Sequence, residues 1–422
     1  MNNSIEALES EVRFYSRLFP AIFSKASGAY VFCNDGSKYL DFFCGSGSLN
    51  YGHSNPVMKQ AVIDYLQGDG IINSLDQMTE AKLKFMKSFY EIILKPRAYN
   101  YKMQFCGPTG TNSIEAAMKL SRKFTQREKI IFFEHSFHGM TYGSMSISGM
   151  KAGKLNKDYT KNSVEMPFAE NENSITILKQ YLENCSTGDL PAAIVMETIQ
   201  AEGGIKVAPK EWIESVAAIS KKFGVLLVID DIQTGCGRTG TFFSFDNMNV
   251  KPDIICLSKS LSGYGFPFSM NLINPEIDCW DPGEHNGTFR GNNLAFIAAN
   301  CALDYWRTDA LSKSIMHCAG LIENYFYSDS NLKQVKLNGR GLMFGIESGD
   351  EEKNTKLQKT LFKNGILMDT CGYRNNVVKI MPPITISDED LIKGLDIIHK
   401  SIIECPAEEK IFSTNSKSYS NV

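Results

Sequence analysis

Short apolar runs that alternate with amphipathic segments are the feature of this chain that most constrains its fold. These five-residue segments lie at 129–133, 192–196, 225–229 and 253–257, and the first and last of them open on a charged residue that precedes four apolar ones. The segments 115–122 and 211–222 have the periodicity of amphipathic helices. Strands that are apolar throughout are typical of parallel sheets buried on both faces. The chain is therefore predicted to form an α/β fold, with a mostly parallel sheet between layers of helices.

Further strand-like segments lie towards the two ends of the chain. They are found at 29–32 and 39–42, with a turn at 34–36 between them, and at 341–346 and 377–380. We expect the two ends to build a small α+β domain together, beside a large domain that holds the parallel sheet. The predicted boundaries are 1–55 for the N-terminal segment, 56–305 for the large domain, 306–405 for the C-terminal region and 406–422 for a polar tail.

The composition argues against several classes of function. A net charge of -3 over 422 residues gives no reason to expect nucleic acid as a partner, and no apolar run approaches the ~20 residues needed to cross a bilayer. The 11 cysteines include no Cys-x-x-Cys pair, so no metal site is predicted. Acidic residues stand where a signal peptide needs basic and apolar ones, and we expect a cytoplasmic protein with reduced thiols.

Two carboxylates, Asp230 and Asp231, follow directly after the apolar run 225–229. A buried carboxylate is costly unless a cation pairs with it. A protonated pyridine nitrogen could be the partner of Asp230, since a carboxylate there keeps the ring protonated and able to accept electrons. Taken alone, the same pattern fits a helix cap or a magnesium ligand at least as well.

Lys259 follows the next apolar run, 253–257, and precedes a loop with Gly263. A single lysine after a strand is usually a solvated surface residue. A lysine whose amine is desolvated at a strand end can instead lose its proton and form an imine with an aldehyde. Carboxyl ends of parallel strands meet at one sheet edge, where ligands bind, so Asp230 and Lys259 together favour the second interpretation.

Three loops offer further contacts for a flat, phosphorylated ligand. Gly110 and Thr111 open the helix that includes 115–122, where free N–H groups attract anions, although an ordinary helix cap has the same pattern. Thr288 lies in a second loop able to give a hydroxyl to phosphate. Phe137 and His138, just past a strand, offer a flat face for stacking, or else a core ring beside a turn.

With these segments in this order, the chain resembles the class III (ω) aminotransferases along nearly its whole length. The residues that carry the resemblance are 197–204, 230–240, 258–259 and 287–289. The resemblance implies a fold-type-I protein with a seven-stranded sheet and pyridoxal phosphate as cofactor. It also implies amino-acid substrates and a homodimer, or a higher even oligomer, with active sites shared between subunits.

The resemblance also implies roles for individual residues. Lys259 would carry the cofactor as a Schiff base and move the proton, and Asp230 would pair with the pyridine nitrogen. Phe137 and Ile232 would cover the two faces of the ring. The other implied cofactor contacts are Gly110, Thr111, His138, Glu197, Gln233 and, from the partner subunit, Thr288. The implied substrate contacts are Ser46, Glu202 and Lys379.

Within the class, the chain is most similar to the diaminobutyrate–2-oxoglutarate transaminases, notably at 49–53, 107–112, 262–265 and 282–293. These enzymes make 2,4-diaminobutyrate and 2-oxoglutarate from aspartate 4-semialdehyde and glutamate. The wider class has an arginine at position 379 that binds a substrate carboxylate. This chain has Lys379 there, and the subgroup that it resembles also has lysine. Glu202 is expected to be either a switch that moves aside for the amino donor or a plain structural ion pair.

Three other functions stay open from the sequence. The chain could be an aminotransferase for another terminal amine, such as ornithine, 4-aminobutyrate or lysine. It could also be a class III aminomutase, which needs no external oxo acid. A catalytically silent binding protein on the same fold is disfavoured, because Lys259 and Asp230 are both present.

Overall fold

The computed structural model describes residues 8–149, 160–329, 332, 335–347 and 351–405. Its centre is a seven-stranded sheet with the order β4-β12-β11-β10-β7-β5-β6. Only β12 runs antiparallel to its neighbours, β11 and β4. The strands are β4 (Lys102–Gly107), β5 (Ile130–Phe133), β6 (Ser163–Met166), β7 (Ala193–Met196), β10 (Leu226–Asp230), β11 (Ile254–Leu257) and β12 (Ser269–Ile273).

Both faces of this sheet are buried, as the continuous apolar runs predict. In β10, Leu227 and Ile229 point into one hydrophobic cluster, whereas Leu226 and Val228 point into another. Helix α6 (Gly110–Thr125) packs in the second cluster, and α8 (Ser174–Asn184) and α9 (Lys210–Phe223) pack in the first. The predicted α/β class and the seven-stranded, mostly parallel sheet are confirmed.

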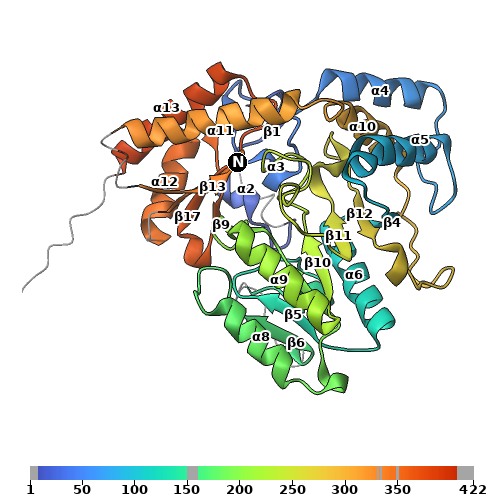
Figure 1. The fold of residues 1–422 in the computed structure, drawn as a ribbon. Helices are drawn as coiled ribbons and strands as arrows, with labels where there is room; N and C mark the ends of the chain where they lie inside the picture. The colour runs from blue at the N-terminus through green and yellow to red at the C-terminus, as the bar shows by residue number, and fades with distance from the viewer. Residues whose placement is uncertain (1–7, 150–159, 330–331, 333–334, 348–350, 406–422) are drawn as a thin grey trace, which may run out of the picture.

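The remaining helices form two groups on either side of the molecule (Figure 1). One group is α4 (Pro56–Gln67), α5 (Glu80–Phe89) and α10 (Asn293–Asp304). Helix α5 continues directly into a short turn at Tyr90–Leu94. The other group is α11 (Ala310–Ser328), α12 (Glu351–Lys363) and α13 (Asp388–Glu404), which surround the smaller sheets. Short helices are α2 (Tyr15–Leu18), α3 (Cys44–Gly47) and α7 (Tyr142–Ser146).

Two four-stranded sheets lie outside the large sheet. The first is β1 (Phe23–Ser27), β2 (Tyr30–Cys33), β3 (Lys38–Asp41) and β15 (Ile366–Leu367), and its parallel β3–β15 pair joins the N-terminal segment to the C-terminal region. The second is β13 (Lys336–Arg340), β14 (Met343–Glu347), β17 (Val377–Ile380) and β16 (Thr370–Cys371). A two-stranded ribbon, β8 (Ile199–Gln200) and β9 (Lys206–Val207), completes the fold. The predicted small α+β unit from both ends of the chain is confirmed, whereas its exact boundaries stay a prediction.

Most predicted strands lie within a residue or two of the observed ones. The predicted strand at 341–346 starts later, at Met343, because Gly341 has a φ of +62° and Leu342 donates its N–H to the Arg238 carbonyl. The polar tail predicted at 406–422 lies outside the described residues. Among those residues, no helix is long and apolar enough to cross a membrane.

Arg238 connects the parts of the fold around its buried guanidinium group. Its Nη1 donates to the carbonyls of Leu342 and Pro382 at 2.8 and 2.5 Å. Its Nε and Nη2 donate to the Asn50 side chain at 3.2 and 2.6 Å. A single side chain therefore ties the loop after β10 to both ends of the chain, since each acceptor is itself buried and needs a donor.

We predict that Arg238→Ala lowers the free energy of unfolding by roughly 3 kcal/mol, because it leaves several buried acceptors without a donor. Chemical denaturation followed by fluorescence measures the change. Arg122→Ala is the control, since Arg122 makes one bond to the Glu128 carbonyl at a half-exposed position. Equal stability of the two variants would contradict the role assigned to Arg238.

Candidate active site

The sheet brings the two strand-end residues of the sequence analysis to one edge. Strands β10 and β11 are parallel, and Asp230 lies opposite Cys256, three residues before Lys259. Lys259 begins a short 3₁₀ turn at Lys259–Ser262 with a φ of +48°, a conformation that is uncommon for a residue other than glycine. Backbone strain of this kind is found at functional sites, where the surrounding structure holds it in place.

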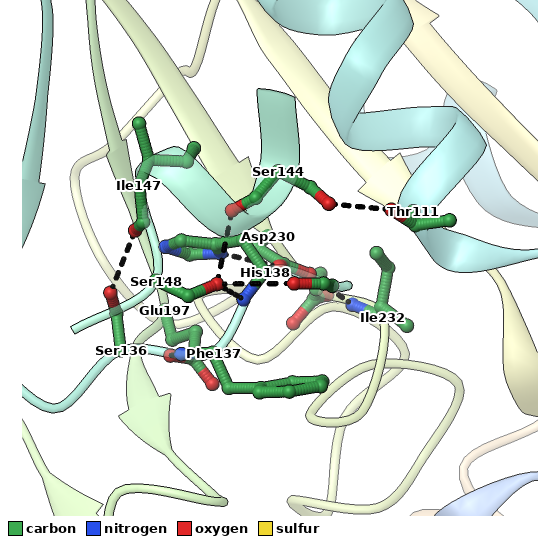
Figure 2. Close-up of polar contacts among 12 residues, drawn as sticks. Thr111, Ser136, Phe137, His138, Ser144, Ile147, Ser148, Glu197, Asp230 and Ile232 are labelled. Carbon is green, nitrogen blue, oxygen red and sulfur yellow. Dashed lines mark hydrogen bonds and ion pairs between the residues drawn. The ribbon is translucent and has the colours of Figure 1, made fainter. Parts of the chain in front are cut away.

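A pocket lies at this edge of the sheet, with Asp230 on one wall and Lys259 on another. Ten of the predicted site residues line it, and Figure 2 shows several of them gathered together. The predicted residues that line it are Gly110, Thr111, Phe137, His138, Glu197, Glu202, Asp230, Ile232, Gln233 and Lys259, and among them only Glu202 was predicted as a substrate contact. Gly139 and Thr234 complete the wall.

Asp230 is held by two donors that set its direction. His138 Nδ1 lies 2.7 Å from Asp230 Oδ2, and the Ile232 N–H donates to Oδ1 at 3.1 Å (Figure 2). The His138 side chain is fully buried, and its backbone N–H donates to Ser148 Oγ at 3.0 Å. The predicted cofactor contact His138 thus contacts Asp230 directly, which makes it an orienting residue for that carboxylate.

The amine of Lys259 has an altered proton affinity. Its Nζ donates to the Ser46 carbonyl at 2.9 Å, and Ser46, like Lys259, has a positive φ, of +54°. Burial lowers the pKa of Lys259 to about 8, with Lys379 acting in the same direction and Glu202 against it. An amine with such a pKa is partly unprotonated near neutral pH, which suits a nucleophile or a proton carrier.

A cluster of hydroxyl groups surrounds the start of α6. Thr111 Oγ1 lies 2.6 Å from Ser144 Oγ (Figure 2). It also lies 2.8 Å from Thr141 Oγ1. The chain needs glycine beside it, because a Cβ on Gly139 would lie 2.5 Å from Thr111 Oγ1 and its φ is +123°. A Cβ on Gly110 would likewise lie 3.0 Å from Ile232. Hydroxyls and free N–H groups at a helix start form an anion site.

These residues fit pyridoxal phosphate. The pocket offers a hydroxyl-lined helix start for a phosphate, a carboxylate for a ring nitrogen, and an amine of lowered pKa for an aldehyde. Glu197 is a further acid of the wall; burial, with Asp230 adding to it, raises its pKa well above the usual range. Its Oε2 accepts from the Phe137 N–H at 3.1 Å. Within the described residues, no group of three or more His, Cys, Asp and Glu side chains could hold a metal ion.

Lys379 is buried beside the pocket and is paired with two carboxylates. Its Nζ lies 2.8 and 3.0 Å from the two oxygens of Glu202, and 3.3 Å from Asp369 Oδ2. Burial by itself lowers the pKa of Lys379, but the two acids outweigh it and raise the pKa well above its usual value. Glu202 also accepts from Gln233 Nε2 at 3.3 Å, and Gln233 donates to the Ser46 carbonyl at 2.7 Å.

Three predicted contacts do not line the pocket: Ser46 and Lys379 contact lining residues, whereas Thr288 lies away from the pocket of its own chain. It is exposed on the loop before α10, next to Phe289, whose side chain is 69% exposed. Asp369, beside Lys379, was not predicted, although it is a carboxylate after a short apolar strand, as Asp230 is. Tyr15, whose hydroxyl lies 3.1 Å from Ser46 Oγ, was not predicted either. No sequence signal pointed to Tyr15, because its neighbours are distant in the chain.

Comparison with known proteins decides the family. The model of the family "Aminotransferase class-III" matches residues 14–402. The chain belongs to the class-III aminotransferases. It is 48% identical over 410 residues to a protein of Sporosarcina pasteurii named diaminobutyrate–2-oxoglutarate transaminase, covering 95% of this chain and 96% of that one. A protein of the same name from Halalkalibacterium halodurans is 46% identical over 409 residues, covering 95% and 96%.

Solved structures agree with the fold of this aminotransferase. A Bacillus anthracis aminotransferase superposes with a TM-score of 0.84 at 22% identity and covers 95% of this chain and 99% of that one. At this identity the similarity concerns the fold. Family membership confirms the predicted transaminase class and, with it, pyridoxal phosphate as the cofactor.

The lowered pKa of Lys259 leads to a prediction about cofactor capture. In cofactor-free protein the rate of covalent attachment of pyridoxal phosphate should rise with pH through a midpoint near 8, because the protonated amine cannot attack the aldehyde. Absorbance gives the rate, and borohydride reduction with peptide mapping identifies the labelled lysine. Lys259→Ala is the control and should remain unlabelled. A midpoint near 10, or a label on another lysine, would contradict the prediction.

Proposed function

We propose that this aminotransferase converts aspartate 4-semialdehyde and glutamate to 2,4-diaminobutyrate and 2-oxoglutarate, reversibly. The observation that carries the proposal is the 48% and 46% identity, over 95% of the chain, to two proteins named diaminobutyrate–2-oxoglutarate transaminase. The lysine at position 379 supports it, since the subgroup that the sequence resembles also has lysine there. Identity at this level over a whole chain makes a shared substrate class the best-supported function.

Pyridoxal phosphate, when bound, supplies an aldehyde for the substrate amine and a ring that accepts electrons from the substrate carbon. Lys259 is the base in this proposal, because its amine lies in the pocket with a pKa of about 8. It would remove the proton from the substrate carbon that bears the nitrogen, and its Nζ would hold that proton for the return step. The Ser46 carbonyl accepts from the amine at 2.9 Å and holds it at the pocket wall.

Asp230 has the role of keeping the ring nitrogen protonated. Its carboxylate is buried, lines the pocket, and is oriented by His138 and by the Ile232 N–H. A fixed charge in a buried site stabilises an opposite charge without reorganisation of solvent. Thr111 and the start of α6 would hold the phosphate, and Phe137 and Ile232 would exclude water from the ring. We assign these roles as part of the same proposal.

Glu202 and Lys379 allow one site to bind two different substrates. In the first half-reaction glutamate brings a carboxylate, which displaces Glu202 from Lys379 and takes its place as the partner of the ammonium group. In the second half-reaction the reacting carbon is a terminal aldehyde. Glu202 accepts from Gln233 Nε2 at 3.3 Å and from Lys379 Nζ at 2.8 Å, and these contacts must open for a substrate carboxylate to take its place.

The substrate assignment is tested with the purified enzyme and four amino compounds. We predict that 2,4-diaminobutyrate and glutamate react fastest with the cofactor-loaded enzyme, and that ornithine and 4-aminobutyrate react more slowly. Single-turnover absorbance of the cofactor measures each half-reaction separately. Faster reaction with ornithine than with 2,4-diaminobutyrate would contradict the substrate assignment, and turnover without any oxo acid would favour an aminomutase.

We also propose a homodimer, or a higher even oligomer, whose subunits complete each other's sites. Large apolar side chains are exposed along 71–78, at 140–142 and at Phe289; they are Ile71, Ile72, Leu75, Met78, Met140, Tyr142 and Phe289. The backbones of 72–74 and 291–293 are hydrogen-bonded to each other, which joins the first and last of these segments. Apolar surface of this extent on a folded chain is typical of a subunit interface.

A second observation supports an interface at the same place. A hollow beside the 280–290 loop is lined by Gln104, Trp280 and Arg290, among others. Each of these three side chains has a buried polar atom without a hydrogen-bond partner among the residues that the structure describes. Buried polar atoms are nearly always paired, so a second subunit that supplies the partners fits this hollow.

The shared site predicts recovery of activity in hybrid oligomers. Thr288→Asp places a negative charge near the partner's phosphate, and Lys259→Ala removes the base, so each variant alone should be almost inactive. Mixed after partial denaturation, they should regain part of the activity, because one site then has both Thr288 and Lys259. Lys259→Ala mixed with Asp230→Asn is the control, and it should regain nothing since both changes affect the same pocket. An active monomer in gel filtration would refute the shared site.

The location is a further part of the proposal. All 11 cysteines are free, and most are buried. Free buried thiols are usual in the reducing cytoplasm, and we propose that the protein acts there.

We also propose the division of the chain into segments 1–55, 56–305 and 306–405, because the β3–β15 pair joins the first and the last of these segments.

A further inference from the structure

A carboxylate, Glu115, lies behind the cluster of hydroxyl groups at the start of α6. It follows Thr111 by about one turn of that helix, so the two side chains are on the same face. Its Oε1 accepts from the Ser144 N–H at 2.9 Å and from the Thr141 hydroxyl. A carboxylate one helical turn from a phosphate site is unfavourable by charge alone, because like charges repel. Its presence therefore calls for a role other than attraction of the phosphate.

The fold leaves space for this carboxylate and for the hydroxyl cluster at two glycines. A Cβ on Gly143 would clash with Glu115 Oε2, and a Cβ on Gly139 would lie 2.5 Å from Thr111 Oγ1. A larger residue at either position would push the segment 139–144 away from α6. The close approach of this segment to α6 is thus built into the sequence, and Glu115 supplies an acceptor that holds the two together.

Glu115 also fixes the direction of the hydrogen bonds in the cluster. A carboxylate accepts and does not donate, so the Thr141 hydroxyl gives its single proton to Glu115. Thr111 Oγ1 lies 2.6 Å from Ser144 Oγ (Figure 2) and 2.8 Å from Thr141 Oγ1. Because the Thr141 proton is committed, Thr111 has Ser144 as its donor. The proton of Thr111 itself is then available to a phosphate oxygen.

Other bonds hold the residues at the ring end of the pocket. The Phe137 N–H donates to Glu197 Oε2 at 3.1 Å. The His138 N–H donates to Ser148 Oγ at 3.0 Å. Neither bond involves Glu115, so loss of this carboxylate should release the turn at the start of α7 and leave the residues around the ring in place.

We propose that Glu115 is a positioning residue for the cofactor phosphate, which holds the turn at 141–144 against α6 and directs the Thr111 hydroxyl towards the phosphate. The inference rests on the proposed role of Thr111 and extends it to the residue behind it. The carboxylate acts as an acceptor through Oε1, and its charge is not what the site requires. The competing explanation is a general contribution to folding, which would affect ligands with and without a phosphate alike.

The test measures the dissociation constants of cofactor-free protein for pyridoxal phosphate and for pyridoxal, which lacks the phosphate, by absorbance titration. For Glu115→Ala we expect the affinity for pyridoxal phosphate to fall by about 10- to 100-fold, the worth of one hydrogen bond to a charged group. The affinity for pyridoxal should stay unchanged. An unchanged affinity for pyridoxal phosphate, or equal losses for both ligands, would overturn the proposal.

Two conservative variants separate position from charge. Glu115→Gln removes the charge but keeps the oxygen that accepts both bonds, so it should bind pyridoxal phosphate as tightly as the wild type or more tightly. Glu115→Asp keeps the charge but withdraws the oxygen by one methylene group, so it should bind this ligand more weakly. The opposite order would refute the positioning role, since it would make the charge decisive. This pair decides the question if Glu115→Ala does not fold.

Two further variants control for folding and for the proposed function. Glu214→Ala is matched, since Glu214 lies on α9 and its Oε1 accepts from the Asn249 N–H at 2.7 Å, away from the pocket; both affinities should equal those of the wild type. Thr111→Ala should weaken binding of pyridoxal phosphate alone. If it has no effect, the proposed phosphate site is wrong. If it weakens binding and Glu115→Ala does not, only the inference about Glu115 is wrong.

Discussion

The parallel pairing of β10 with β11 is the constraint on which the site depends. It sets Asp230 opposite Cys256, so that the carboxylate and the Lys259 amine emerge at one edge of the sheet. Parallel strands end together, and the loops that follow them must therefore share one crevice. The pairing is secure because both faces of the sheet are buried, and a shift of one residue would exchange the side chains of its two clusters.

Buried charges organise the rest of the molecule around this edge. Arg238 ties both ends of the chain to the loop after β10, and Lys379 connects Glu202 of the large sheet region with Asp369 of the smaller one. Each charge was taken out of water and needs partners, so the segments that supply those partners are held at fixed positions. The same physics lowers the pKa of Lys259, since burial disfavours its charged form.

Much of the site was predictable because its residues follow strand ends or open a helix. Asp230, Lys259, Gly110 and Thr111 all have such positions, and all four line the pocket. Tyr15 and Asp369 were missed because their neighbours come from distant segments, and a carboxylate after a two-residue strand gives only a weak local signal. Thr288 could be placed on its loop but not in a site, since the single chain holds it away from its own pocket.

By itself, the sequence determined the α/β class, four strands of the large sheet and the aminotransferase family, and it predicted most of the residues that line the pocket. It could do so because apolar periodicity and short motifs are local properties of the chain. Tertiary structure alone decided that Lys379 is shared by two carboxylates, that His138 orients Asp230, and that Arg238 joins both ends of the chain. These contacts link segments that are up to 188 residues apart, and burial and charge compensation between distant groups leave no periodic signal in the sequence.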